Sequence, residues 1–296
     1  MISTLILTKN EEQDLPGCLA SLSWCNDIHV FDSYSADKTI EIAEKAGARI
    51  TQRKFDGYSS QRNAALEELE YKYPWLFILD ADERIPAQLV PVLKKHIASS
   101  SEAVNGFRLR RKDYLGSTWL KHAQISPFYI RLVRVGKARY HREINEVLEV
   151  DGKVEEIDGF FDHYPFSKGL SHWINKHNQY SSMEAVRWVE EHKGNLKFSW
   201  IKALFSSDFS EKRYHQKGLF YKLPFRPLIK WLYIVIGRRA FLDGRAGITY
   251  ASLQAIYEYF IVIKTKELLK QGFYESKEGK GILPDTLISH PSVVEG

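Results

Sequence analysis

The sequence predicts an α/β fold built on a mostly parallel sheet with helices on its faces, followed by a helical C-terminal extension. Apolar, β-rich runs alternate with amphipathic helical stretches through the first hundred residues, which is typical of right-handed strand–helix–strand crossovers. Hydrophobic residues make up 44% and charged residues 27% of the 296-residue chain, which excludes intrinsic disorder and coiled-coil architectures. The length fits two domains, or one large domain with an appendage.

The first hundred residues provide four strand–helix pairs. Asp14 with Pro16 marks the start of the first helix, and Gly47 stands where the C-terminal cap of the second belongs. We expect strands at Ile2–Thr8, Ile28–Phe31, Arg49–Thr51 and Leu76–Leu79, and helices at Asp14–Leu22, Ala36–Ala46, Ser59–Leu69 and Ala87–Ala98.

The pattern changes beyond Gly106. Runs of alternating polarity there predict antiparallel additions to the sheet, and two longer stretches predict helices. The last twenty-odd residues contain several glycines and prolines and read as a loose tail. We expect strands at Phe107–Arg110, Tyr129–Val135 and Ile144–Val150, helices at Leu170–Glu191 and about Tyr250–Leu269, and domains at 1–190, 191–270 and 271–296.

Basic charge is concentrated in one segment. Residues Lys193–Ala240 hold 11 basic and 2 acidic side chains together with ten aromatics, whereas the rest of the chain holds 31 basic and 35 acidic residues. Aromatic rings among lysines and arginines suit the headgroup region of an anionic membrane. A pair of core helices with a solvated basic face is the alternative. Nucleic-acid binding ranks last, since no nucleic-acid-binding fold is evident.

The sequence predicts neither a signal peptide nor a membrane-spanning segment. The N-terminus lacks the basic start of a signal peptide, and the longest apolar stretch, Leu228–Ile236, is shorter than the ~20 residues that span a bilayer. The two cysteines, Cys18 and Cys25, read as reduced thiols. We therefore expect a cytoplasmic protein, peripheral on the inner face of the cytoplasmic membrane.

The sharpest chemical feature is a cluster of carboxylates at the end of the buried strand Leu76–Leu79. Asp80, Asp82 and Glu83 follow it directly, and Asp80 and Asp82 face the same side if the backbone stays extended. Such close charges repel one another, and a divalent cation such as Mg²⁺ or Mn²⁺ relieves the repulsion while binding a phosphate. The alternative is a solvated turn with a helix-capping Asp.

Polar residues also follow the other parallel strands, at the edge where ligands of such sheets bind. Asp32 can accept the N–H of a nucleobase, while Thr8 and Glu11 can contact a base or a ribose. Each of these can equally be a turn or capping residue. Arg62, within a predicted helix, offers a planar fork for phosphate or base, or is a plain surface arginine.

Taken together, these motifs resemble family-2 glycosyltransferases of the GT-A fold. The resemblance covers about residues 1–265 and is strongest to residue 85. Phe161-Asp162-His163-Tyr164 and Phe241-Leu242-Asp243-Gly244 look like the branch that contains lipopolysaccharide-core β-1,4-glucosyltransferases. The N-terminal motifs that recur in this order are Thr8-Lys9-Asn10-Glu11, the stretch Val30–Thr39, Gln61-Arg62-Asn63 and Leu79-Asp80-Ala81-Asp82-Glu83.

The resemblance implies a GT-A-type, Rossmann-like sheet and a nucleotide-sugar donor, expected to be a UDP-hexose. It implies that Asp80 reaches the ribose and that Asp82, with His163, binds the metal that bridges the diphosphate. A satisfied core or turn histidine is the alternative for His163. The residues that the resemblance implies for donor binding are Thr8, Asn10, Glu11, Asp32, Ser33, Arg62 and Asp80.

Inverting transfer also needs a base for the acceptor hydroxyl, and a carboxylate is expected. Glu146 is the first candidate and Glu143 the second, with a surface glutamate as the alternative reading. The acceptor is expected to be a lipid-linked saccharide, and the donated hexose glucose. Two other functions remain open. A nucleotidyltransferase is disfavoured because no Gly-rich loop follows the first strand, and a silent membrane-binding scaffold is disfavoured because the aspartates are intact.

Overall fold

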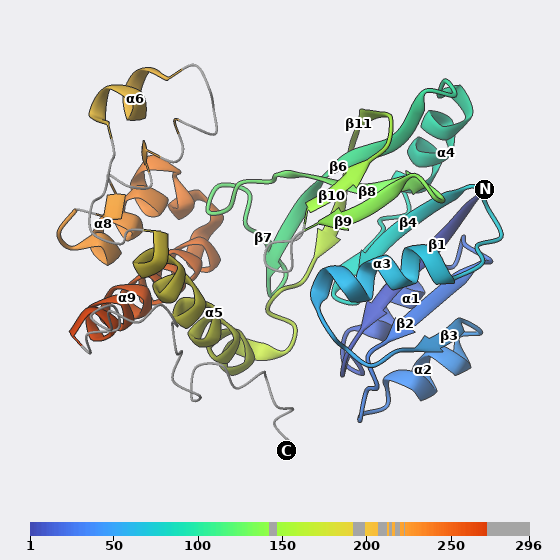
Figure 1. The fold of residues 1–296 in the computed structure, drawn as a ribbon, viewed down its shortest axis with the longest axis horizontal. Coiled ribbons are helices and arrows are strands. Elements are labelled where there is room, and N and C mark those ends of the chain that lie inside the picture. The colour runs from blue at the N-terminus through green and yellow to red at the C-terminus, as the bar shows by residue number, and fades with distance from the viewer. Residues whose placement is uncertain are drawn as a thin grey trace, which may run out of the picture. The chain divides into compact units, whose positions relative to one another are not determined.

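The structure is a computed structural model that describes residues 1–141, 147–191, 199–206, 212, 215–216, 220–221 and 223–270. It divides into two compact units, Met1–Gly169 and Leu170–Gly296 (Figure 1). Unit 1 contains the sheet that the sequence predicts, and unit 2 is helical in the residues described.

The N-terminal half of unit 1 is a parallel sheet in the order β3-β2-β1-β4. Its registers align the strand ends, because Thr8 is the partner of Asp32, and Leu7 is the partner of Asp80. The apolar runs Ile2–Thr8 and Trp75–Asp80 form central strands because helices cover both faces and bury nearly every side chain. The strands are β1 (Ile2–Thr8), β2 (Ile28–Asp32), β3 (Arg49–Gln52) and β4 (Trp75–Asp80).

The second half of the sheet is mixed. Strand β8 pairs antiparallel with β4 and with β6, β11 runs parallel to β6, and β5 and β7 pair antiparallel with β11 and β6. A separate hairpin, β9–β10, packs beside it. The strands are β5 (Glu83–Arg84), β6 (Val104–Leu115), β7 (Thr118–Trp119), β8 (Phe128–Arg134), β9 (Ala138–His141), β10 (Val147–Val150) and β11 (Lys153–His163).

Helices cover the sheet on both faces. The larger core cluster packs α1 (Leu15–Ala20), α2 (Thr39–Lys45) and α4 (Leu89–Ser99) against one face. On the other face, α3 (Tyr58–Glu68) and the β9–β10 hairpin pack against β1, β2, β4 and β8. The sheet is thus held between two apolar layers over its parallel half, and its carboxyl edge is left for polar residues.

Unit 2 consists of two long helices and several short ones in the residues described. Helices α5 (Gly169–Glu191) and α9 (Gly244–Lys270) share a small core of Ala185, Val189 and Leu268. Between them lie α6 (Trp200–Phe205), α8 (Arg226–Leu232), the π-helical turn η1 (Tyr233–Gly237) and the 3₁₀ turn η2 (Ala240–Asp243). None of the described helices has both the length and the apolar content to cross a bilayer.

The predicted α/β architecture, its antiparallel additions and its C-terminal helices are confirmed. By packing, α5 belongs to unit 2, whereas the functional division at residue 190 stays a prediction. Strand β11 was not predicted, because Lys153–His163 carries several charges and an interrupting Gly159, and its register with β6 shifts between Glu156 and Phe160. The predicted tail lies outside the described residues, as do residues 193–198, 207–211, 213–214, 217–219 and 222 of the basic segment.

Candidate active site at the carboxyl edge of the sheet

The carboxyl ends of β1, β2 and β4 bring most of the predicted site residues to one edge. The parallel registers place Thr8 beside Asp32, and place Asp80 at the level of β1's last residues. The polar loops that follow these strands are joined by hydrogen bonds: the backbone N–H of Asn10 donates to Ser35 Oγ at 2.8 Å, and that of Glu11 donates to Thr39 Oγ1 at 2.7 Å. The loops therefore form one connected rim.

Asp80 is fixed by two arginines. Arg62 donates to Oδ1 at 2.9 Å, and Arg131 donates to Oδ2 at 3.0 Å. Burial alone would raise the pKa of Asp80, but the two guanidinium groups hold it well below its ordinary value. Asp80 is consequently ionised at neutral pH. The sequence did not predict the role of Arg131, because an arginine within a strand of alternating polarity gives no indication of which carboxylate it will pair with.

Glu83 anchors the turn that follows β4. Its side chain is fully buried, accepts the backbone N–H of Asp80 at 3.0 Å and pairs with Arg131 at 2.5 Å. Residue Glu83 also begins β5, where it is the register partner of His163 on β11. The pairing with β11 brings His163 beside the carboxylates that follow β4.

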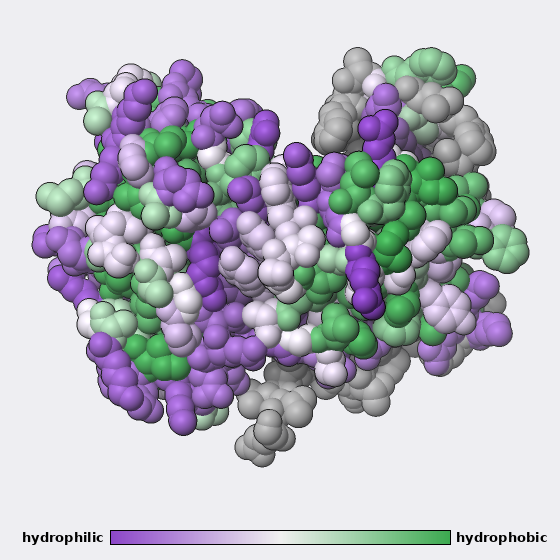
Figure 2. Space-filling model, turned by 180° about the vertical axis from the view of Figure 1, so that it is seen from behind, coloured by the Kyte–Doolittle hydropathy of each residue, from purple (hydrophilic) through white to green (hydrophobic). Residues whose placement is uncertain are grey.

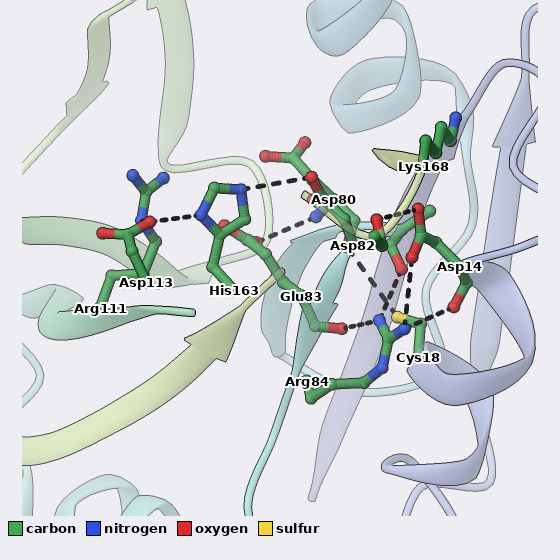
Figure 3. Close-up of polar contacts among 12 residues, drawn as sticks. Asp14, Cys18, Asp80, Asp82, Glu83, Arg84, Arg111, Asp113, His163 and Lys168 are labelled. Atoms are coloured by element: carbon green, nitrogen blue, oxygen red, sulfur yellow. Dashed lines mark hydrogen bonds and ion pairs between the residues drawn. The ribbon is translucent and has the colours of Figure 1, made fainter. Parts of the chain in front are cut away.

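His163 lies between two carboxylates from different parts of the chain (Figure 3). Its Nε2 lies 3.2 Å from Oδ2 of Asp82, and its Nδ1 lies 2.5 Å from Oδ1 of Asp113. Burial would lower the pKa of His163, but Asp82 and the hydrogen bonds to both carboxylates raise it to about 9. Gln124 and Arg111 contact Asp113 in turn, at 2.8 Å and 3.0 Å.

The Asp82–His163 pair would hold a divalent cation only after His163 Nε2 loses the proton that it shares with Asp82, since a metal binds the neutral imidazole and displaces that proton. Octahedral Mg²⁺ holds its ligands at about 2.0–2.1 Å, which puts neighbouring ligand atoms roughly 3 Å apart. The 3.2 Å between Asp82 Oδ2 and His163 Nε2 is close to that spacing. Asp113 on Nδ1 orients the ring, as carboxylates commonly do behind metal-binding histidines.

The protein supplies few ligands for such an ion. Across the described ranges, no group of three or more His, Cys, Asp and Glu side chains is arranged to hold a metal. Proteins commonly bind magnesium with one or two of their own ligands, and phosphate oxygens and water complete the coordination shell. The residues therefore fit an ion that enters with a diphosphate, and Asp113 is the orienting residue that sequence analysis missed.

Glu11 lies at the same rim, beside a cation from later in the chain. Lys168 pairs with Glu11 Oε1 at 2.8 Å and donates to the carbonyl of Asn10, also at 2.8 Å. Burial raises the pKa of Glu11 to about 7 in spite of this lysine. Asn10 itself has a φ of +53° and accepts the N–H of Ala36 on its side chain. Lys168 too was missed, since only the fold brings it here.

Asp32 is fully buried and is surrounded by donors of its own chain. Thr8 Oγ1 and the backbone N–H of Ser35 each donate to it at 2.8 Å, and Gln52 donates at 3.2 Å. Ser33 is buried beside it and accepts from Gln61 at 3.0 Å. For Asp32 to meet a nucleobase, one of these donors must move, so its donor-binding role stays a prediction.

The predicted base is not placed. Glu146 and Glu143 lie outside the described residues, between β9 and β10. Thr8, Asn10, Glu11, Asp32, Ser33, Arg62, Asp80, Asp82 and His163 are all described, and all lie at the rim or in the layer just beneath it.

The sequence matches a family model over residues 3–148, described as "Glycosyl transferase family 2". The lipopolysaccharide core biosynthesis glycosyltransferase LpsC of Rhizobium meliloti (strain 1021) is 30% identical over 273 residues, which are 89% of this chain and 91% of that protein. The uncharacterized glycosyltransferase RT0209 of Rickettsia typhi is 29% identical over 65% of this chain and 69% of its own.

A solved structure of glucosyl-3-phosphoglycerate synthase from Mycobacterium tuberculosis, in complex with Mg²⁺ and uridine diphosphate, is 22% identical with a TM-score of 0.32. The match covers 38% of this chain and 43% of that one, which is too little to bear on function. The family assignment rests on the R. meliloti relative, which is 30% identical over nearly its full length, and the family model matches the N-terminal half of the chain. The chain belongs to glycosyl transferase family 2 and is a family-2 glycosyltransferase.

Proposed function

We propose that this glycosyltransferase is inverting and metal-dependent, and that it moves a hexose, glucose in our reading, from a UDP-sugar to a hydroxyl of a lipid-linked glycan such as lipopolysaccharide core. The glycan class is supported by the name of the R. meliloti relative. The donor class is supported by the polar rim at the carboxyl edge of a parallel sheet, where nucleotides bind in α/β folds.

The observation that carries the proposal is the Asp82–His163 pair, backed by Asp113 and set beside the ionised Asp80. Asp82 and His163 would hold Mg²⁺ or Mn²⁺ against the diphosphate of the donor. When bound, the ion offsets the charge that develops on the departing diphosphate, which is worth several kcal/mol.

The chain's own residues account for donor orientation. Asp80, kept ionised by its two arginines, is an acceptor for a ribose hydroxyl. Arg62 contacts Asp80 and lies over the ring of Tyr140 at 5.2 Å, which fixes its guanidinium at the rim. Glu146 is proposed to take the proton of the acceptor hydroxyl as the new glycosidic bond forms.

The test is calorimetric titration of uridine diphosphate in the presence of Mn²⁺. Asp82→Asn and His163→Gln are expected to lose most of the Mn²⁺-dependent affinity, because each removes one of the two protein ligands. Asp158→Asn, an exposed residue of β11, is the control and is expected to bind as the wild type does. Unchanged Mn²⁺-dependent binding in Asp82→Asn would show that Asp82 is not a ligand.

The proposed place of action is the inner face of the cytoplasmic membrane. Unit 2 exposes many hydrophobic side chains (Figure 2), including Phe225, which is 78% exposed, and Ile236, which is 64% exposed. Arg239 and Arg245 are exposed among them, and the one acidic residue of the stretch 225–245, Asp243, is buried. We name the α8–η2 surface by its exposed apolar residues Phe225, Leu228, Leu232, Tyr233, Ile236, Phe241 and Leu242.

This surface suits the boundary of an anionic bilayer, with rings and aliphatic groups at the acyl boundary and arginines on phosphates. Each basic residue near such a surface contributes about 1 kcal/mol. The exposed apolar side chains and the exposed Arg239 and Arg245 of the stretch 225–245 support this part of the proposal.

A further inference from the structure

Cationic and aromatic side chains alternate on one face of the mixed half of the sheet in unit 1. They come from β6, β7, β8 and β11, which are neighbours in the sheet (Figure 1). We define the β6 face by five of these residues: Arg110, Lys112, Trp119, Phe128 and Phe160.

The strand registers put these side chains on the same side of the sheet. Arg110 is the partner of Phe128 on β8 and of Phe160 on β11, so the three form one cross-strand row. The guanidinium of Arg110 lies 4.8 Å from the ring centre of Phe128 and 6.0 Å from that of Phe160. Lys112, two residues further along β6, lies 5.0 Å from Phe160 and 4.8 Å from Trp119.

Both cations of this face pack against aromatic rings. Within the described residues, neither Arg110 nor Lys112 forms an ion pair, whereas Arg108, the next cation along β6, pairs with Glu156. Asp162, the register partner of Lys112, interacts with it electrostatically and partly offsets its charge. Arg110 packs on two rings, which fix its position without cancelling its charge and leave it free to bind an anion.

Two buried polar atoms near this face are left without a hydrogen-bond partner. They are Nε1 of Trp119 and Oδ1 of Asp162, and neither has a partner within the described part of the chain. Unsatisfied buried groups are rare and call for an explanation such as a ligand. The carboxyl of Asp162 already has a hydrogen bond with the side chain of Tyr114, so the indole N–H is the group for which a hydroxylated ligand on the β6 face would supply an acceptor.

The face leads to the metal-binding pair. Tyr114 follows Lys112 on β6 and stacks on Tyr164, with ring centres 5.0 Å apart. The backbone N–H of Tyr164 donates to the carbonyl of Asp82 at 2.9 Å. The end of the β6 face is therefore joined through backbone to the residue that would hold the donor's diphosphate, while the His163 side chain lies on the other side of β11.

We propose that the β6 face binds the sugar acceptor, and that this acceptor is an anionic saccharide with phosphate or carboxylate groups close to the accepting hydroxyl. Arg110 and Lys112 bind the acidic groups, and the rings of Trp119, Phe128 and Phe160 supply the apolar contact area for sugar rings. The inference rests on the proposed glycosyl transfer, and it assigns residues and a substrate class to its acceptor side.

The test measures acceptor binding without the donor. The probe is the phosphorylated oligosaccharide released from lipopolysaccharide by deacylation, compared with the same oligosaccharide after phosphatase treatment and with neutral maltoheptaose. Arg110→Gln and Lys112→Gln are each expected to weaken binding of the phosphorylated probe about three- to fivefold, as exposed charge contacts do. Trp119→Ala is expected to weaken binding of all three probes.

Lys95→Gln on α4, which packs on the opposite face of the sheet, is the control and is expected to bind as the wild type does. The phosphatase arm tells phosphate from carboxylate, since only a phosphate contact is lost on treatment. The proposal is overturned if the Arg110→Gln/Lys112→Gln double variant binds like the wild type, if Lys95→Gln loses as much affinity, or if maltoheptaose or a single-stranded oligonucleotide binds as tightly as the phosphorylated probe.

The outcome is separable from that of the proposed function. Both glutamine variants are expected to titrate Mn²⁺ and uridine diphosphate like the wild type, while the KM for a transferring acceptor rises with kcat nearly unchanged. A wild-type chain that transfers sugar but whose acceptor KM is unmoved by these variants refutes the acceptor assignment alone. A chain that binds no nucleotide refutes the glycosyl transfer, while the oligosaccharide titration still decides what the β6 face binds.

Discussion

Arg131 is predicted to be the residue on which the order of the site depends most. Its guanidinium is 8% exposed and pairs with Asp80 at 3.0 Å and with the fully buried Glu83 at 2.5 Å. Replacing it by Met leaves the buried Glu83 without its cation, while Asp80 keeps Arg62. Breaking a buried ion pair by removing one partner costs about 3–5 kcal/mol.

The effect of Arg131→Met is measurable by urea denaturation at pH 7, with amide exchange of β4 and β8 showing where protection is lost. Glu83→Gln alone is expected to lower the free energy of unfolding by less, because Arg131 still has Asp80 as its partner. The double variant Arg131→Met/Glu83→Gln is expected to lose less stability than the two single variants together, because the carboxylate that Arg131→Met leaves without a cation is then neutral. Additive losses, or wild-type stability in Arg131→Met, would refute this reading of the network.

A functional consequence follows from the same contacts. Glu83 is the register partner of His163 and accepts the backbone N–H of Asp80, so its pairing with Arg131 fixes the turn that carries Asp82. Arg131→Met should therefore also weaken Mn²⁺-dependent nucleotide binding, although Arg131 itself is no metal ligand.

Three further predictions concern other parts of the chain. Because burial raises the pKa of Glu11 from 4.5 to about 7, the folded state keeps a proton that the unfolded state loses, so stability should fall by about 3 kcal/mol as the pH rises from 4.5 to 7, and Glu11→Gln should flatten this slope in urea titrations across pH. Ile236→Asp and Phe241→Asp should each abolish most co-sedimentation with anionic vesicles at low salt; binding equal to that of the wild type would remove the membrane proposal. Gly247→Ala would place a Cβ 2.0 Å from the backbone oxygen of Ala240, so thermal unfolding should show a loss of about 1–3 kcal/mol.

The parallel half of the fold was predictable because local signals agree there. Asp14 and Pro16 mark a helix start, and Trp75–Asp80 is apolar until its last residue because helices bury both faces of its strand. The structure shifts these elements by only a few residues. The mixed half was less predictable, because its strands have one open face and charged residues that resemble a loop.

The site shows the same division. Thr8, Asp32, Asp80 and Asp82 follow strands whose ends a sequence can locate, so their convergence follows from parallel pairing. Arg131, Asp113 and Lys168 could not be found in that way, because nothing local in the chain says which distant carboxylate each will meet. His163 was found through resemblance, and its partner Asp113 only through the register of β6 with β11.

Strand β11, the longest of the strands that were not predicted, is the one that makes the site possible. β11 carries Phe160 toward the β6 face and His163 toward Asp82, since successive residues of a strand point to opposite faces. Asp82 comes from the donor side of the sheet, so an ion held by Asp82 and His163 would join the two halves of unit 1. A change that shifts β11 by one residue would move His163 away from Asp82 and turn Phe160 into the core, and it should abolish Mn²⁺-dependent nucleotide binding and acceptor binding together.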